Sequence, residues 1–191
     1  MSDMASVYER YRISLGEYHR MVQAGVFDVD ARVELVNGEL IEMPPIHPPH
    51  ASGVERILNQ FALRLAGRAW IRCQDPITLP PDSEPQPDLV LAPLQLEQYR
   101  NHHPAPNEIL LAVEVAESTL ATDRKVKVPL YARSGIREVW LVNLADDELT
   151  VYRDPIGAWY GSVQSYHHGD SIAPQAFPDV RFEIGDLLPR R

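Results

Sequence analysis

The chain of 191 residues is poor in cysteine, in long apolar runs and in positive charge. Cys73 is the single cysteine, so an internal disulfide framework of the kind found in small secreted domains is excluded. Residues 1–12 are polar and charged and lack the apolar core of a signal peptide. No segment approaches the roughly 20 apolar residues of a membrane-spanning helix. We therefore expect a cytoplasmic protein with no membrane-embedded part.

Lysine and arginine number 18 against 27 aspartates and glutamates, which gives a net charge of -9. Tight non-specific binding to nucleic acid depends on neutralising phosphates with cationic side chains, so this balance argues against a broad nucleic-acid-binding surface. A local basic groove would still be enough for a nuclease. The sequence also lacks a glycine-rich phosphate loop, a dinucleotide-binding fingerprint and a Ser-His-Asp arrangement.

The composition that remains is that of an ordinary globular protein, with 45% hydrophobic and 24% charged residues. The length suits one well-packed domain better than two, so we expect a single domain over residues 1–191. Ser14 and Glu17 have the spacing of a capping box, which predicts a helix to about Ala24. The dipeptide Asn37-Gly38 between two apolar segments predicts a β-hairpin with a type I′ turn.

Apolar periodicity predicts the remaining elements. A second helix is expected over residues 50–67, and a third from Thr122 or Asp123 to about Ser134, with Gly135 after its end. Strands are expected at residues 69–74, 77–79, 88–91, 109–115, 138–143, 148–153 and 159–166, and residues 182–188 close the fold. The order predicts an α/β fold, a central sheet flanked by helices, with an N-terminal helix and hairpin and a strand-rich C-terminal tail.

Glu114 lies inside the apolar run of residues 109–116, which is typical of a strand buried on both faces. A buried carboxylate must be neutralised, paired or bound to a metal, because an unpaired buried charge is strongly unfavourable. Asp88 opens another apolar run, and Lys127 follows Glu114 in the chain. Two acids on neighbouring strands and a lysine indicate a metal-assisted phosphodiester hydrolase. The alternatives are an ion pair for Glu114, a solvated strand start for Asp88, and an exposed lysine paired with Asp123.

Several stretches together resemble the Uma-two-type family of proposed bacterial restriction endonucleases, within the PD-(D/E)XK nuclease superfamily. The resemblance spans about residues 14–153, and the stretches that carry it are Glu34-Leu35-Val36-Asn37-Gly38-Glu39-Leu40, Pro87-Asp88, Glu114-Val115, Ser118-Thr119, Asp123, Lys127, Tyr131 and Gly135-Ile136-Arg137-Glu138-Val139-Trp140-Leu141-Val142. It implies a restriction-endonuclease-like central mixed sheet and a metal-dependent endonuclease acting on DNA, with Mg²⁺ or Mn²⁺ as cofactor.

The resemblance also implies roles for individual residues. Asp88, Glu114 and the backbone carbonyl of Val115 would hold the metal ion, and Lys127 would act beside it on the attacking water or on the phosphate. It further implies a homodimer.

One position departs from the superfamily pattern, because Ala116 stands where a lysine is expected two residues after Glu114. Lys127 on the following helix is the expected replacement, and Lys125 is a possible substitute. Pro129 complicates this expectation, because a proline is tolerated in the first turn of a helix but not in its interior. The helix would either start near Lys125 or bend, and both would move Lys127 relative to the acids.

A third acid is expected from Glu39 or Glu55, of which Glu39 is favoured because it lies within the matching stretch after the hairpin turn. For each of them the alternative is an exposed acid. His50 matches a histidine often seen in the family. A different class of function is also open, namely a catalytically inactive member of the fold that binds nucleic acid or serves in assembly. The acidic balance favours that alternative, whereas the retained Asp88, Glu114 and Lys127 favour the enzyme.

Overall fold

The chain folds around a central mixed β-sheet, in a computed structural model that describes residues 10–28, 30–95 and 98–188. The elements are α1 (Leu15–Gln23), β1 (Val33–Val36), β2 (Glu39–Glu42), α2 (Pro48–Leu65), β3 (Ala69–Cys73), β4 (Leu89–Pro93), η1 (Gln98–Arg100), η2 (Pro106–Glu108), β5 (Leu111–Ala116), α3 (Leu120–Thr122), η3 (Asp123–Lys127), α4 (Val128–Arg133), β6 (Glu138–Asn143), β7 (Glu148–Ile156), β8 (Trp159–Tyr166), β9 (Ser171–Ile172), β10 (Phe182–Glu183) and α5 (Ile184–Leu187).

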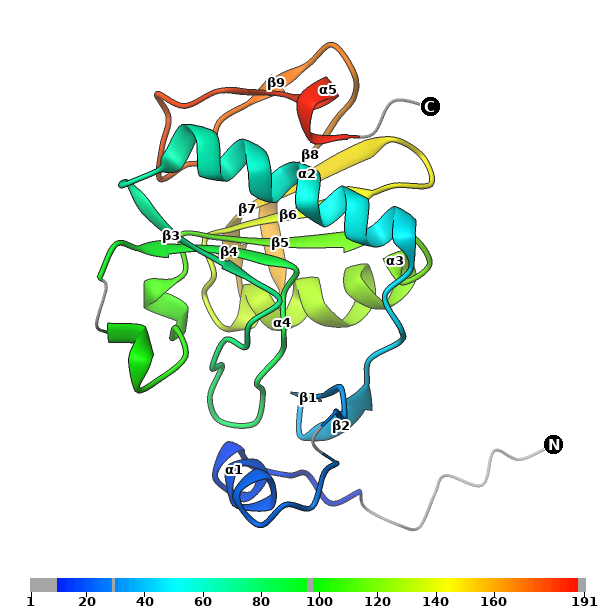
Figure 1. Cartoon of the computed structure of the whole chain (residues 1–191), viewed down its shortest axis with the longest axis vertical. Coiled ribbons are helices and arrows are strands. Elements are labelled where there is room, and N and C mark those ends of the chain that lie inside the picture. The colour runs from blue at the N-terminus through cyan, green and yellow to red at the C-terminus, as the bar shows by residue number, and fades with distance from the viewer. Residues whose placement is uncertain (1–9, 29, 96–97, 189–191) are drawn as a thin grey trace, which may run out of the picture.

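The central sheet has the strand order β3-β4-β5-β6-β7-β8. Adjacent strands of this sheet are antiparallel, except for β5 and β6, which are parallel. A parallel pair needs a crossover connection, and the continuous helical segment α3-η3-α4 supplies it. Figure 1 shows α2 above the sheet and α4 below it. The predicted α/β fold, a mixed sheet flanked by helices, is confirmed.

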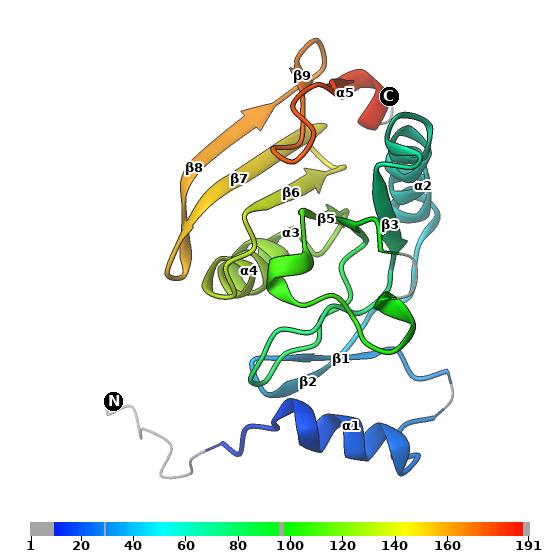
Figure 2. The same cartoon turned by 90° about the vertical axis from the view of Figure 1, so that its left-hand side faces the viewer.

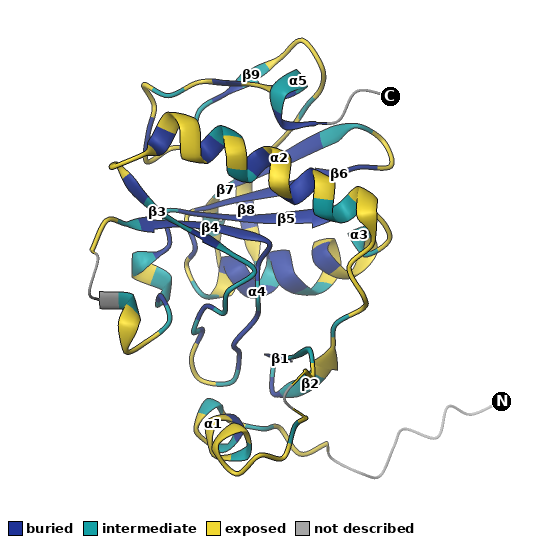
Figure 3. Cartoon of the chain, in the orientation of Figure 1, coloured by how far each residue is buried: buried dark blue, intermediate teal, exposed yellow. Residues whose placement is uncertain are grey.

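Alternation along β5 directs its side chains to two different helical layers. Val113 and Val115 pack in the cluster that includes α2 and α5, whereas Ala112 and Ala116 pack in the cluster that includes α4. Glu114 lies two residues from both Ala112 and Ala116, so its side chain is on the same face of the strand as theirs. Its carboxylate therefore lies on the α4 side of the sheet. Figure 3 shows that the central strands are buried while the outer faces of the helices are exposed.

The N-terminal helix and the hairpin are confirmed. Ser14 caps α1, and the capping box with Glu17 is complete. Strands β1 and β2 are antiparallel, and Asn37 and Gly38 between them have φ values of 51° and 72°, as a type I′ turn requires. The hairpin contacts the loop before β4 through the Glu84 amide, which donates to the Leu35 carbonyl at 2.7 Å. Figure 2 shows α1 and the hairpin together at one end of the molecule.

The helix after β5 begins at Leu120, so of the two alternatives for Pro129, a start near Lys125 or a bend, the late start is wrong. The segment Asp123–Lys127 is a π-helix, in which the Val128 amide donates to the Asp123 carbonyl. Pro129 has no amide hydrogen and its ring would crowd the carbonyl four residues earlier in a regular helix. The wider π turn accommodates this proline within a continuous helical segment.

The other strands follow the predicted order with small shifts at their ends. Of the short strand expected at residues 77–79, the structure has a single bridge between Leu79 and Ser83. The excursion between β4 and β5 carries η1 and η2, and its residues 96–97 lie outside the described part. The C-terminal tail contains β9 and β10 but ends in the short helix α5. Among the described residues, no helix is long and apolar enough to cross a membrane.

Candidate active site

The two acids predicted for the site come from adjacent strands. Glu114 lies in β5, and Asp88 directly precedes β4. The strands pair with Leu89 opposite Val113, so the next position in this register brings Asp88 beside Glu114. The amide of Val115 donates to Asp88 Oδ2 at 2.8 Å, which fixes the carboxylate against β5. Both side chains are buried, with Asp88 8% and Glu114 3% exposed.

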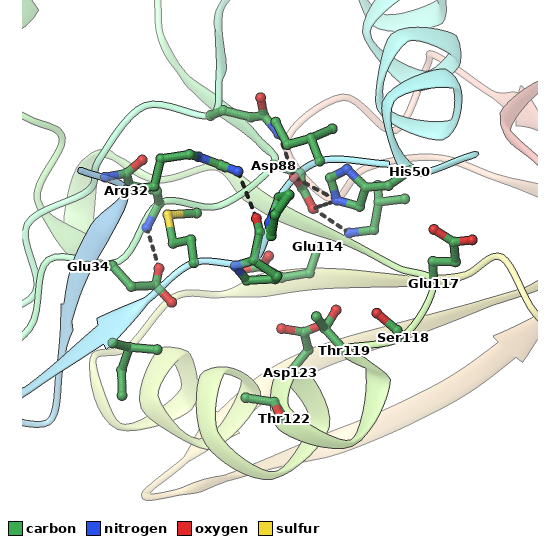
Figure 4. A pocket seen from close by; sticks show the side chains of 18 of the residues that line it. Arg32, Glu34, His50, Asp88, Glu114, Glu117, Ser118, Thr119, Thr122 and Asp123 are labelled. Carbon is green, nitrogen blue, oxygen red and sulfur yellow. Dashed lines mark hydrogen bonds and ion pairs between the residues drawn. The ribbon is translucent and has the colours of Figure 1, made fainter. Parts of the chain in front are cut away.

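Asp88 has two further polar partners. Gln74 Nε2 donates to Asp88 Oδ1 at 3.2 Å, and His50 Nε2 lies 3.2 Å from the carboxylate. The contact with Asp88 raises the pKa of His50, while burial of the ring opposes the shift. Figure 4 shows His50, from the start of α2, facing Asp88. These contacts hold the acid in one orientation at the edge of a cavity.

Lys127 meets Glu114 although the two are 13 residues apart in sequence. Its Nζ lies 3.4 Å from the Glu114 carboxylate, and the Tyr131 hydroxyl donates to Glu114 Oε1. Lys127 and Tyr131 are four residues apart, so they lie on the same side of the helix. Burial raises the pKa of Glu114 well above its ordinary value, and the nearby ammonium of Lys127 opposes the shift. The structure thus brings together Asp88, Glu114 and Lys127.

The third acid in this group is Glu34 of β1. Its Oε2 lies 3.5 Å from Lys127 Nζ and accepts a hydrogen bond from the Gln86 amide at 3.0 Å. Glu34 is buried. Sequence reasoning missed it, although the signal was the one that identified Glu114, a carboxylate in an apolar strand between Val33 and Leu35.

The other candidates lie away from the group. Glu39 was favoured as the third acid, but it forms ion pairs with Arg12 at 2.9 Å and Arg10 at 3.3 Å on the outside of the hairpin. Glu55 is exposed on α2, and Lys125 is exposed on η3. None of Glu39, Glu55 and Lys125 lines the cavity around Asp88 and Glu114. The acid that joins Asp88, Glu114 and Lys127 at the cavity is thus Glu34, and neither Glu39 nor Glu55 does so.

The cavity has a volume of about 360 Å³ and a strongly acidic lining. Asp123 adds another buried carboxylate, which accepts a hydrogen bond from the Thr119 hydroxyl at 2.7 Å. Figure 4 shows Asp123 and Thr119 across the cavity from Asp88. Of the described residues that line it, six carry carboxylates: Glu34, Glu42, Asp88, Glu114, Glu117 and Asp123.

Lys127 stays protonated in these surroundings. Burial alone would lower the pKa of its ammonium group, but the carboxylates of Glu114, Glu34 and Asp123 outweigh burial and raise the pKa above its ordinary value. Burial also raises the pKa of Asp123, and Lys127 opposes that shift. The site therefore combines two permanent cations, Lys127 and Arg32, with six carboxylates, which outnumber them.

Comparisons with known proteins assign the chain to a family. Residues 15–185 match the model of the Uma2 family, which is described as "Putative restriction endonuclease". The chain belongs to this family. A search of curated proteins found no match for this Uma2 chain.

A solved structure shares the fold of this Uma2 chain. It is described as the crystal structure of "a putative nuclease belonging to DUF820 from Anabaena variabilis ATCC 29413". The two superpose with a TM-score of 0.70 at 16% sequence identity, and the match covers 92% of this chain and 97% of that chain. The likeness is one of fold, and the family assignment supports a nuclease.

The donor set of the Uma2 site suits a cation that keeps part of its water shell. Among the residues that the structure describes, no group of three or more His, Cys, Asp and Glu side chains is placed to hold a metal ion by a cage of protein ligands. Mg²⁺ is commonly bound by one or two carboxylates and retains several waters, so it does not require such a cage. Asp88 and Glu114 offer two hard oxygen donors at a solvent-accessible cavity, and the excess of negative charge there favours a dication.

Proposed function

We propose that this protein is a metal-dependent endonuclease that hydrolyses phosphodiester bonds of DNA, with Mg²⁺ or Mn²⁺ as cofactor. The observation that carries the proposal is that Asp88, Glu114 and Lys127, from two strands and a helix, meet at one cavity. The family assignment supports the same class of activity.

In this proposal Asp88, Glu114 and the backbone carbonyl of Val115 would hold the cation. When bound, the cation would lower the pKa of a water ligand and offset charge on the phosphate. Asp88 is already oriented by the Val115 amide and Glu114 by the Tyr131 hydroxyl, so little rearrangement is needed.

Lys127 would act as a fixed positive charge and not as a general base, because its raised pKa keeps the ammonium protonated at neutral pH. It would donate a hydrogen bond to a non-bridging phosphate oxygen as negative charge increases there. In the hydrolysis the oxygen of water forms a bond to phosphorus and the bond to one ester oxygen breaks. The released ester oxygen takes a proton, and the products are a phosphate monoester end and a hydroxyl end.

The test is cleavage of single- and double-stranded DNA, and of RNA, with Mg²⁺, Mn²⁺ or EDTA. Glu114→Gln and Asp88→Asn should each lower the rate by about a hundred-fold or more, a loss of the size seen when a group that stabilises the transition state is removed. Glu39→Gln and Glu55→Gln are matched controls that change acids outside the cavity and should retain activity. The same trace activity in wild type and in the two site variants would end the catalytic proposal.

The same experiment addresses an inactive binding or assembly module of this fold. Such a module would bind nucleic acid without metal-dependent cleavage, and neither Glu114→Gln nor Asp88→Asn would alter its behaviour. The acidic lining of the cavity gives that alternative no specific support, because it would repel phosphate in the absence of a cation.

We further propose that the protein forms a homodimer through β8. This strand is the last in the order of the described sheet, and Figure 2 shows it at the outer edge. Its eight residues include none with charge, and Trp159 is 76% exposed. An uncharged edge strand can pair with a second copy around a two-fold axis without like-charge repulsion. Light scattering should report a dimer for wild type and a monomer for Val163→Lys, and an unchanged mass in the variant would contradict this interface.

A further inference from the structure

The candidate site lies between two walls of different origin. One wall is the segment of residues 41–47, which comprises the end of β2 and the residues after it, and the other is the segment of residues 117–123, which follows β5. Asp88 and Glu114 are almost completely buried between these walls. A phosphodiester must therefore enter the cavity to reach them, because the two carboxylates are not presented on an open surface.

The wall formed by residues 41–47 is held in place. Arg32 Nη1 donates to the Pro44 carbonyl at 2.8 Å, and the Met43 amide donates to the Arg32 carbonyl at 2.8 Å. Pro44 and Pro45 restrict the backbone further. The cavity of about 360 Å³ is thus a defined space, near the lower end of the range for small-ligand pockets. Its size suits about one nucleotide.

The charges at the walls disfavour a duplex. Glu42 on one wall and Glu117 on the other are exposed, and both line the cavity. A DNA duplex carries about one charge per 1.7 Å of its axis, and it is stiff over about 150 base pairs. A duplex laid across the walls would bring flanking phosphates against these carboxylates. An unpaired strand is flexible, so it can insert one phosphodiester and direct its neighbours away.

The wall of residues 41–47 also offers apolar contact beside the acids. Ile41, Met43 and Ile46 line the cavity together with the two prolines. An unpaired nucleobase can cover such a surface with its face and so remove apolar area from water, whereas a base stacked within a duplex has no free face. The cavity therefore presents cation-binding oxygens for a phosphate next to an apolar surface for a base.

We propose that the substrate is an unpaired nucleotide of a nucleic-acid strand, in a single strand, a gap or a flap, and not a phosphodiester within continuous duplex. This inference rests on the proposed endonuclease activity and names the substrate class of the same site. The walls of the cavity select the unpaired strand, and Asp88 and Glu114 act on the phosphodiester that it inserts.

The experiment compares wild type with Ile46→Asp, which adds a carboxylate to the apolar wall. Wild type with Mg²⁺ or Mn²⁺ should cleave a single-stranded oligonucleotide about ten-fold or more faster than the same sequence in a continuous duplex. Ile46→Asp should lose about ten-fold in kcat/KM on the single strand, in keeping with the loss of one apolar side chain buried against a base. Leu63→Asp is the matched control, because Leu63 is 77% exposed on α2 while Ile46 is 43% exposed at the cavity.

Two further measurements separate the two proposals. Bis(p-nitrophenyl) phosphate reports on the chemistry without a strand, so its cleavage should be lost in Glu114→Gln and retained in the control Leu63→Asp. Failure of wild type to cleave it or any nucleic acid would overturn the proposed function. Even in that case, fluorescence anisotropy with Ca²⁺ should show that wild type binds the single strand more tightly than the duplex. Duplex cleaved as fast as the single strand, or bound as tightly, would overturn the inference about the substrate.

Discussion

Replacing Lys127 with methionine should strongly destabilise the metal-free protein. Lys127 Nζ lies 3.4 Å from Glu114 and 3.5 Å from Glu34, and all three side chains are buried. Methionine keeps most of the apolar stem but leaves both carboxylates without their cation. Removing one partner of a buried ion pair costs about 3–5 kcal/mol. At about 2–4 °C per kcal/mol for a chain of this length, Tm should fall by roughly 6–20 °C.

The loss should grow with pH. Burial already raises the pKa of Glu114 above its ordinary value of 4.5, so the folded state binds a proton there more readily than the unfolded chain does. Such an acid reduces stability as pH rises from the ordinary pKa towards the raised one. Without Lys127 the pKa of Glu114 rises further, and this window extends to higher pH. Lys127 has a raised pKa, so in wild type its stabilising contribution is complete at both pH 5 and pH 8.

Urea denaturation in EDTA at pH 5 and pH 8 provides the measurement. Lys127→Met should lose more stability at pH 8 than at pH 5, where Glu114 takes up a proton. The double variant with Glu114→Gln should regain part of the loss, because one of the two unpaired charges is gone. Lys125→Met changes an exposed lysine and should alter stability by no more than about 0.5 kcal/mol. Equal losses at the two pH values, or a double variant less stable than Lys127→Met, would refute the reasoning.

Three further outcomes are expected. Glu34→Gln should lower kcat by about 10–100-fold, as for a group that orients a site residue. Titration calorimetry should show an unchanged Mg²⁺ affinity, and a large loss of affinity would instead make Glu34 a metal ligand. Tyr131→Phe removes the hydroxyl that donates to Glu114 and should lower the free energy of unfolding by about 1–3 kcal/mol in urea. Gly38→Ala should cost about 1–2 kcal/mol or more, because φ is 72° and the new Cβ would lie 2.9 Å from Arg12 Cβ; an unchanged Tm would contradict this.

Features that depend on short stretches of sequence were predictable. The hairpin follows from Asn37-Gly38, because only a few residues adopt positive φ at low cost. The placement of Glu114 in a buried strand follows from the apolar residues around it. Asp88 could be assigned to the neighbouring strand start, although its position beside Glu114 depends on the register of β4 and β5.

The third acid was missed, although Glu34 carries the same signal as Glu114, a carboxylate between apolar residues of a strand. Glu34 and Glu39 lie on the two strands of one hairpin and on the same face of it, because Glu34 pairs with Ile41 and Val36 with Glu39, so strand alternation does not separate them. Packing separates them, because Glu34 is covered by the Gln86 amide and Lys127, residues that are distant in sequence. The match of Glu39 to a family stretch was a weaker guide than the apolar neighbours of Glu34.

The position of Lys127 depends on a local backbone feature that no residue pattern specified. Pro129 cannot donate a hydrogen bond, and the helix responds with a π turn just before it. The turn ends at Lys127, so Lys127 and Tyr131 remain four residues apart in a regular geometry and both reach Glu114. Pro129 thus does not displace the lysine from the acids.

Four buried acids of the site each accept a hydrogen bond from a neutral donor, which orients the carboxylate without neutralising it. These donors are the Gln86 amide for Glu34, the Val115 amide for Asp88, the Tyr131 hydroxyl for Glu114 and the Thr119 hydroxyl for Asp123. Lys127 contributes one positive charge to the group. An arrangement selected for stability alone would pair or replace these acids, since buried charges without counter-ions are unfavourable. Oriented carboxylates with an uncompensated charge are what a site for a dication requires, so the same residues that reduce stability in the metal-free state support the proposed cofactor.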